Sequence, residues 1–219
     1  MTPHVADTPV LETERLILRA PAPQDWPAFA AFYATDRAQF VGGPVDARKA
    51  WRAFGHVIGH WVLRGFGSFI VARRGSDAAI GLVGPWFPEG WPEREIGWTL
   101  WDTALQGTGI AHEAAAAARA HAFRELGWQT AVSYVDPANA RSIALATRLG
   151  AVRDTAAPTP DGDDTLVFRL SNKPVLREVS QDWRTHVSYA ADGTVVETVI
   201  LEARECGAWP LSVEHHAAA

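Results

Sequence analysis

The chain has 219 residues, of which 47% are hydrophobic and 21% charged, and its formal net charge is -5. This size allows one globular domain with an appendage, and the lack of a basic stripe argues against a nucleic-acid partner. No apolar run approaches the ~18 residues of a membrane span, and a start without a basic or apolar leader predicts a cytoplasmic protein. The single cysteine, Cys206, excludes an internal disulfide and a cysteine-based zinc cluster.

The first part of the chain predicts one strand and then two helices. The apolar run at residues 16–19 ends at prolines and is typical of a strand. Asp25 can cap the helix that follows, with Pro27 in its first turn. After a glycine-proline break at residues 42–44, aromatic residues recur three or four apart at 48–63, which indicates a second helix.

The middle of the chain predicts a mixed α/β fold. Strands are expected at 68–73, 79–84, 95–101, 131–135, around residue 152 and at 165–170, and helices over 106–126 and 139–149. The predicted order is therefore β-α-α-β-β-β-α-β-α-β-β.

The last part of the chain differs in kind. Apolar runs at 187–190 and 195–201 flank Asp192-Gly193, a hairpin signal, and the end consists of small residues. We expect residues 10–170 to form the main domain. Residues 171–219 are expected to form an extra hairpin and a frayed end, packed on that domain or on a second subunit of a homodimer.

A glycine-rich hexapeptide lies between a predicted strand and a predicted helix. It consists of Gln106, Gly107, Thr108, Gly109, Ile110 and Ala111. The glycines allow close backbone approach, and the first N–H groups of a helix are unpaired and attract anions, so this turn predicts a phosphate site. A dinucleotide fingerprint would need a further glycine and a Walker loop a lysine, which disfavours NAD and ATP.

Three segments of the chain together resemble one protein family. The pattern Gln-x-x-Gly-x-Ala follows the strand at 95–101, Asn139 opens a helix that ends in a glycine, and residues 11–19 begin the domain. Together they resemble the GCN5-related N-acetyltransferases (GNAT), and the start resembles the subgroup that acetylates ribosomal-protein alanine N-termini. The resemblance covers about residues 10–170 and not the tail.

The resemblance implies the GNAT fold and acetyl-CoA as cofactor. The backbone of Thr99 and Trp101 is expected to pair with the pantetheine arm between two splayed parallel strands, while the hexapeptide binds the pyrophosphate. Asn139 would reach the pantetheine from the other side and can also be a helix N-cap. We expect Gly109→Val to block cofactor approach with little effect on folding.

The proton transfers have separate candidates. An alkyl ammonium has a pKa near ~10, so an acceptor amine needs a base. Alternation along a strand places Glu95 on the face of Thr99, where some relatives keep a catalytic glutamate, and Glu93 is the next candidate. Many relatives use a tyrosine as acid where this chain has Ala146. Ser142 resembles the serine that the ribosomal subgroup uses, although a thiolate can also leave without an acid.

The acceptor is expected to be a primary amine of a protein N-terminus, polyamine, amino acid or aminoglycoside. Phe40, Trp86 and Trp91 lie where this fold builds its acceptor pocket, or they simply pack in the core. His56 and His60 lack the glutamate of an HExxH site, so no metal is expected. The alternative function is a non-catalytic acyl-CoA-binding module or sensor, which turnover would distinguish.

Overall fold

The fold is given by a computed structural model that describes residues 5, 7–160 and 164–171, and the backbone of three strands between residues 177 and 200. The chain divides into two compact units, Met1–Ser171 and Asn172–Ala219. The first unit contains all the helices of the described residues.

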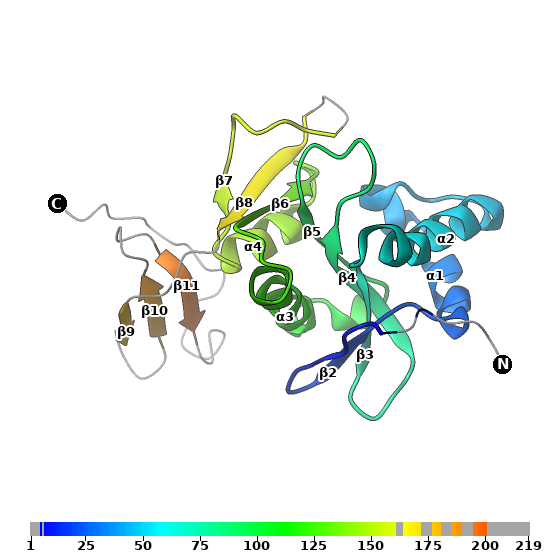
Figure 1. Ribbon diagram of the computed structural model, residues 1–219, viewed down its shortest axis with the longest axis horizontal. Helices are drawn as coiled ribbons and strands as arrows, with labels where there is room; N and C mark the ends of the chain where they lie inside the picture. The colour runs from blue at the N-terminus through cyan, green and yellow to red at the C-terminus, as the bar shows by residue number, and fades with distance from the viewer. Residues whose placement is uncertain are drawn as a thin grey trace. The chain divides into compact units, whose positions relative to one another are not determined.

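An eight-stranded sheet forms the centre of the first unit. Its strands are β1 (Leu11–Glu12), β2 (Leu16–Arg19), β3 (Phe69–Arg73), β4 (Ala79–Trp86), β5 (Glu95–Leu100), β6 (Thr130–Val135), β7 (Val152–Arg153) and β8 (Leu166–Ser171). They lie in the order β1-β2-β3-β4-β5-β6-β8-β7 (Figure 1). Only β5 and β6 pair in parallel within this sheet. The predicted mixed α/β fold is confirmed, with the two-residue β1 added.

The helices lie between the strands as the sequence predicts. The α-helices are α1 (Trp26–Tyr33), α2 (Ala47–Arg64), α3 (Ile110–Arg124) and α4 (Ala140–Arg148), and short 3-10 helices are η1 (Pro23–Asp25), η2 (Asp36–Val41) and η3 (Thr103–Leu105). The Asp46 carboxylate caps α2 by accepting the Lys49 N–H at 2.8 Å. Within the described part of the chain, no helix has the length and apolar character that crossing a bilayer requires.

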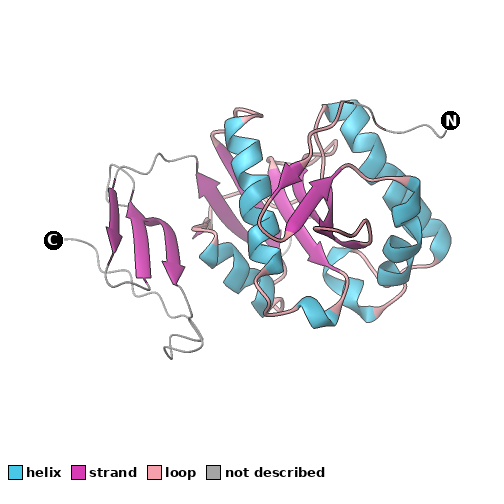
Figure 2. Cartoon of the chain, turned by 90° about the horizontal axis from the view of Figure 1, so that it is seen from below, coloured by secondary structure: helices cyan, strands magenta, loops and turns pink. Residues whose placement is uncertain are grey.

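Helices cover both faces of the sheet (Figures 1 and 2). On one face α3 packs against β2, β4 and β5 over a core that includes Leu18 and Ile96. On the other face α1 and α2 pack on each other around Phe29, Phe54 and Val57. Because successive strand residues point to opposite faces, each site residue of β5 lies either on the α3 face or on the α1 and α2 face.

Asp25 does not cap α1 through its side chain as predicted. It occupies the N-cap position, but its carboxylate makes no cap bond. Instead the carboxylate, which is 1% exposed, accepts bonds from the two Arg19 Nη atoms at 2.8 and 2.7 Å and from the Ala22 N–H at 2.8 Å. Leaving a buried carboxylate without a cationic partner costs more free energy than leaving a helix without a cap. The Asp25–Arg19 pair also joins the end of β2 to the start of α1.

The second unit contains a three-stranded antiparallel sheet. Its strands are β9 (Arg177–Ser180), β10 (Thr185–Tyr189) and β11 (Val195–Ile200), in the order β11-β10-β9. Strands β10 and β11 correspond to the two predicted ones, while their expected turn at Asp192-Gly193 lies outside the described residues. Strand β9 was not predicted, because a run of four residues with one apolar side chain, Val179, gives little strand signal.

Candidate active site

The two parallel strands of the sheet, β5 and β6, separate after a single paired position. Glu95 pairs with Val132, whose N–H donates to the Arg94 carbonyl at 2.8 Å. Beside this pair, the Ser133 hydroxyl donates to the Ile96 carbonyl at 2.7 Å. Both strands continue toward their carboxyl ends with no further pair between them in the described chain. The gap leaves backbone groups of β5 that need another hydrogen-bond partner.

The glycine-rich hexapeptide connects η3 to α3. Gly107 and Gly109 have φ angles of 73° and 81°, in the left-handed region that favours glycine. Gly109 is the N-cap residue of α3, and no side chain caps this helix. The Ile110 side chain is buried and the Thr108 hydroxyl donates to the Leu105 carbonyl at 2.6 Å, so these residues offer mainly backbone groups. An anion is the natural partner for the N–H groups of this first helical turn.

The turn between β1 and β2 holds the hexapeptide in place. Glu113, in the first turn of α3, accepts bonds from the Thr13 hydroxyl at 2.5 Å, the Arg15 N–H at 2.9 Å and Arg15 Nε at 2.6 Å. Arg15 Nη1 also donates to the Thr108 carbonyl at 2.9 Å. Partial burial raises the pKa of Glu113, but these bonds outweigh it and the pKa falls below its usual value. Glu113 therefore ties the turn between β1 and β2 to the start of α3.

Gly109 is a poor site for the predicted valine test. A Cβ atom there would lie 3.3 Å from Arg15 Nη2, and the backbone has a φ of 81°. A β-branched residue is strained in this region, so the expectation of little effect on folding is wrong. Gln106 and Ala111, at the two ends of the hexapeptide, are each partly buried.

The register between β4 and β5 contradicts the predicted pantetheine contacts. The Trp101 N–H donates to the Ile80 carbonyl at 2.9 Å, and Thr99 occupies the equivalent position two residues earlier. Alternate residues of a strand direct their N–H and C=O groups to the same neighbour, so the backbones of Thr99 and Trp101 face β4. By this alternation Trp98 and Leu100 face the gap instead.

Arg37 binds the end of β5 from the segment between α1 and α2. Its Nη2 donates to the Leu100 carbonyl at 2.9 Å and its Nε to the Trp101 carbonyl at 3.2 Å. The Trp101 ring packs against Phe29 and Phe32 of α1. This strand end is thus held on the α1 side of the sheet.

Asn139 and Ser142 open α4 across the gap from β5. Asn139 Oδ1 accepts the Ser142 N–H at 3.2 Å, which is the predicted N-cap bond. Ser142 Oγ accepts a bond from Trp98 Nε1 at 3.1 Å, so Trp98 connects β5 with α4. Ala146, one turn further along α4, is fully buried and brings no polar group to the gap.

Glu95 lies at the closed end of the gap, on the α1 and α2 face of the sheet. Its Oε2 accepts the Trp91 Nε1–H at 2.8 Å, and Trp86 is its direct partner on β4. Burial raises the pKa of Glu95 to about 7, although the bond from Trp91 favours the carboxylate. A carboxyl group with this pKa can take up and release a proton near neutral pH. Ser142 lies beyond the opposite face, so the two candidates flank the gap.

Tyr134, which was not predicted, lies beside Glu95. It follows Val132 by two residues on β6, so it shares the face of Glu95. Its ring meets that of Trp91 edge to face with centroids 6.1 Å apart. The hydroxyl oxygen is buried and has no hydrogen-bond partner among the described residues. Burial raises the pKa of Tyr134 to about 12 and the negative charges of Glu93 and Glu95 act in the same direction, whereas the Glu93 backbone and the Arg169 charge oppose the rise less strongly.

Glu93, the second candidate for the base, belongs to an ion-pair network. Its two carboxylate oxygens accept bonds from Arg169 Nη1 and Nη2 at 2.7 and 2.8 Å. Arg169 Nε donates to Asp154 at 2.6 Å, and Nη1 also contacts the Thr130 hydroxyl at 3.3 Å. Both carboxylate oxygens of Glu93 are thus occupied by one arginine, so this network favours Glu95 over Glu93 for contact with an acceptor.

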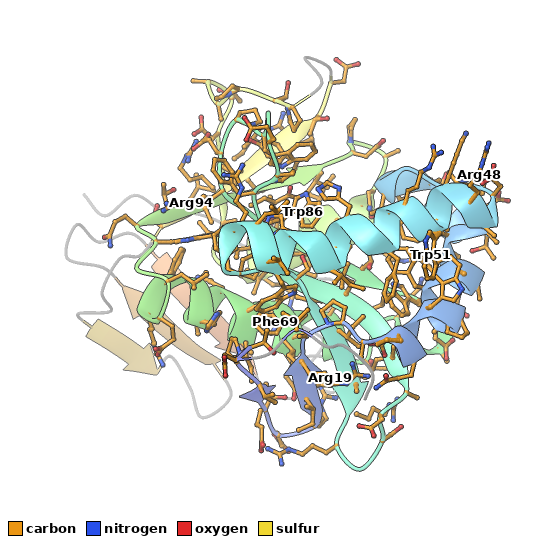
Figure 3. All side chains as sticks on the ribbon, turned by 45° about the vertical axis from the view of Figure 1, so that its right-hand side comes forward. Arg19, Arg48, Trp51, Phe69, Trp86 and Arg94 are labelled. Atoms are coloured by element: carbon orange, nitrogen blue, oxygen red, sulfur yellow. The ribbon has the colours of Figure 1, made fainter. Side chains whose placement is uncertain are left out.

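The structure brings only some of the predicted acceptor residues together. Trp86 and Trp91 both lie beside Glu95, whereas Phe40 is in η2 and 38% exposed. Trp86 lies against α2, where its ring stacks on His60 with centroids 4.6 Å apart (Figure 3). Both His60 ring nitrogens are bonded to backbone groups, at 2.8 and 2.9 Å. Among the residues that the structure describes, no three His, Cys, Asp or Glu side chains form a metal-binding group.

Comparison with known proteins identifies the family. The acetyltransferase (GNAT) domain matches residues 15–152. The chain belongs to the GNAT acetyltransferase family. A solved acetyltransferase from Agrobacterium tumefaciens str. C58 is 38% identical to this GNAT chain, with 77% of this chain and 98% of that chain covered and a TM-score of 0.70.

Two further GNAT structures extend the comparison. A protein assigned to the GNAT acetyltransferases of Bordetella pertussis is 26% identical, with 74% of this chain and 99% of that chain covered and a TM-score of 0.63. The ribosomal-protein-S5-alanine acetyltransferase from Vibrio fischeri is 17% identical, with 76% and 100% covered and a TM-score of 0.59, and it shares the fold. The protein is an acetyl-CoA-dependent N-acetyltransferase of the GNAT fold.

The described residues fit the cofactor of a GNAT enzyme. An uncapped helix start after two left-handed glycines suits a pyrophosphate, and a gap between parallel strands suits an extended arm. Sequence reasoning missed Tyr134, Trp98, Arg15 and Arg37. For Tyr134, alternation along the predicted strand at 131–135 was the available signal, but it needed the pairing register of β5 and β6. The other three act through contacts that only the fold brings together.

Proposed function

We propose that this GNAT enzyme transfers the acetyl group of acetyl-CoA to a primary amine by direct attack in a ternary complex, with Glu95 as the general base. The observation that supports this proposal is the position of Glu95, at the closed end of the gap and with a pKa of about 7. A base whose pKa lies close to the working pH is effective in proton transfer.

The cofactor supplies an acetyl group activated as a thioester. We infer that the backbone N–H groups of residues 106–111 bind its pyrophosphate and that the Trp98 backbone, which faces the gap, pairs with the pantetheine arm. Asn139 lies on the α4 side of the same gap, and its amide N–H₂ has donors left after its oxygen has capped the helix.

Glu95 makes the acceptor nucleophilic by taking its proton. An alkyl ammonium with a pKa near ~10 is almost wholly protonated at neutral pH, so the proton must leave before or during attack. The amine nitrogen then bonds to the acetyl carbonyl carbon as the carbon–sulfur bond breaks. The first proton goes to Glu95 directly or through water, the nitrogen releases a second proton to water as the amide forms, and CoA leaves as the thiolate.

We infer that Ser142 stabilises the departing sulfur. Its Oγ accepts the Trp98 Nε1–H, which leaves the serine's own hydrogen to be donated elsewhere. Glu95 and Ser142 lie on opposite sides of the gap, so the proton is removed on one side while negative charge develops on the other. A hydroxyl directed at that charge acts as a preorganised donor, without having to lose its proton.

The test is acceptor-dependent release of free thiol from acetyl-CoA by the purified protein, over a panel of peptide N-termini, polyamines, amino acids and aminoglycosides. We expect turnover with at least one class and its loss in Glu95→Gln but not in Glu89→Gln. The control makes the same chemical change at a side chain that is 99% exposed. Ala146, buried where many relatives place a tyrosine, favours a non-catalytic acyl-CoA sensor as the alternative. Tight acetyl-CoA binding without turnover on any amine would establish that alternative.

A further inference from the structure

The buried hydroxyl of Tyr134 has no hydrogen-bond partner in the part of the chain that the structure describes. Its oxygen is inaccessible and makes no hydrogen bond to any described residue. Folded proteins pair nearly all buried polar groups, because an unpaired one has lost its water without compensation. A residue kept at this cost next to Glu95 is explained if a ligand completes its hydrogen bonding.

Trp91 covers both polar groups of this subsite, which consists of Glu95 and Tyr134. Its indole N–H donates to Glu95 Oε2 at 2.8 Å, and its ring meets the Tyr134 ring edge to face. Trp91 lies in the loop between β4 and β5, next to Gly90, whose φ is 81°. The indole offers a single donor, and Glu95 takes it. An ammonium group carries three donors and can therefore serve Glu95 and Tyr134 together.

The charges around the subsite favour a cation and disfavour a substrate carboxylate. Glu93 and Asp154 both bind Arg169, and these three side chains are about one-quarter exposed. Four of the five N–H donors of Arg169 are already used, on Glu93, Asp154 and Thr130. Two carboxylates against one arginine leave a negative charge beside Glu95, and this arginine has little capacity left for a second anion.

We propose that the acceptor is an amine with no carboxylate beside its amino group, and that its ammonium binds between Glu95 and the Tyr134 hydroxyl in place of the Trp91 indole N–H. This inference rests on the proposed function and narrows its acceptor class. Peptide N-termini, polyamines and aminoglycosides remain acceptors, whereas free α-amino acids are excluded.

Matched acceptors test the charge argument. Tyramine is tyrosine without its carboxylate, and alaninamide is alanine with the carboxylate replaced by a neutral amide. With acetyl-CoA saturating, we expect kcat/KM for the carboxylate-free member of a pair to exceed that of the amino acid by about 100-fold, because a like charge placed beside a carboxylate costs several kcal/mol. Calorimetric titration of the CoA-bound protein with the same pairs gives the comparison independently of turnover. Equal or tighter use of the amino acids would overturn the proposal.

Tyr134→Phe tests the hydroxyl. The variant removes an unpaired buried oxygen, so we expect Tm to stay the same or rise. The acceptor KM or Kd should rise about 10- to 100-fold, as for loss of a hydrogen bond to a charged group, with the acetyl-CoA Kd unchanged. Tyr33→Phe makes the same change in α1 and should leave all three quantities unaltered.

The outcomes separate this inference from the proposed function. An unchanged acceptor affinity in Tyr134→Phe, or a lower Tm with parallel loss of acetyl-CoA binding, would show that the hydroxyl has no acceptor role. Wild-type protein that binds acetyl-CoA but acetylates no amine would instead refute the proposed function. In that case the titrations with amine pairs still decide whether the subsite selects carboxylate-free amines.

Discussion

Replacing Glu95 by glutamine separates two consequences of burying this carboxyl group. Glutamine keeps the size of the side chain and an oxygen for the Trp91 N–H, but it carries no charge. In the wild-type protein burial raises the pKa of Glu95 from the usual 4.5 to about 7. Glu95→Gln should therefore remove the general base and, at the same time, remove the cost of a charge in a desolvated position.

The size of the stability effect follows from the two pKa values. A difference of about 2.5 between them corresponds to roughly 3 kcal/mol at about 1.4 kcal/mol per tenfold change. Because the folded-state pKa is raised, the protonated group's contribution to stability is fully present below pH 4.5 and is lost as the pH rises through 7. The glutamine variant has no such loss. Its free energy of unfolding should exceed that of the wild type by up to roughly 3 kcal/mol at pH ~8, and the excess should vanish toward pH ~4.5.

Urea unfolding at several values between pH ~5 and ~8.5 measures this excess, with Glu89→Gln as the exposed control. On the catalytic side kcat should fall about 10²- to 10⁴-fold with acetyl-CoA affinity unchanged, and the deficit should shrink at high pH as the acceptor itself deprotonates. If the variant is no more stable than the wild type at pH ~8, the charged Glu95 carboxylate does not destabilise the folded protein, and the argument from its burial is wrong. Near-normal turnover at pH ~7 would assign the proton transfer to another group.

Three other predictions concern contacts of the same domain. Trp98→Phe should lower kcat through Ser142, so Ser142→Ala and the double variant should have equal rates, and additive losses would contradict this coupling. Glu113→Ala should reduce stability by about 1–3 kcal/mol and raise the acetyl-CoA Kd, measured by urea unfolding and calorimetry. An unchanged Kd would show that the contacts of Glu113 with Thr13 and Arg15 do not support acetyl-CoA binding. Asp25→Asn leaves the mostly buried Arg19 without its charge partner and should cost about 3 kcal/mol in the same unfolding assay, while acetyl-CoA binding at low temperature stays normal.

The order of strands and helices could be predicted from local signals in the sequence. Apolar runs of period two and helical spacing of aromatic residues predicted the order of strands and helices, and the glycines predicted the turn before α3. These signals arise within a few neighbouring residues, which is why they can be read without the fold. The strand β9 and the two-residue β1 were not predicted, because strands this short show no periodic pattern of apolar residues.

The details of the site depended on register and on distant partners. Alternation along β5 placed Glu95 on one face but could not tell which neighbour the backbone of Thr99 and Trp101 would face, since that is decided by pairing with β4. Asp25 had the residue type and position of a cap, yet the buried charge of Arg19 took its carboxylate. The catalytic and acceptor roles of Glu95, Ser142, Phe40, Trp86 and Trp91 stay predictions.

The contacts of Glu113 on α3 with Thr13 and Arg15 have a consequence for the time course of folding. Glu113 bonds to Thr13 and Arg15, which precede it by 100 and 98 positions, so the glycine-rich hexapeptide is fixed by one of the longest chain closures among the described residues of the domain. Contacts between such distant residues form late, because the intervening chain loses much entropy when its ends meet. During synthesis the first strands leave the ribosome long before α3 exists. In refolding experiments, affinity for CoA should therefore be acquired after most of the helical signal, and it would report the final step.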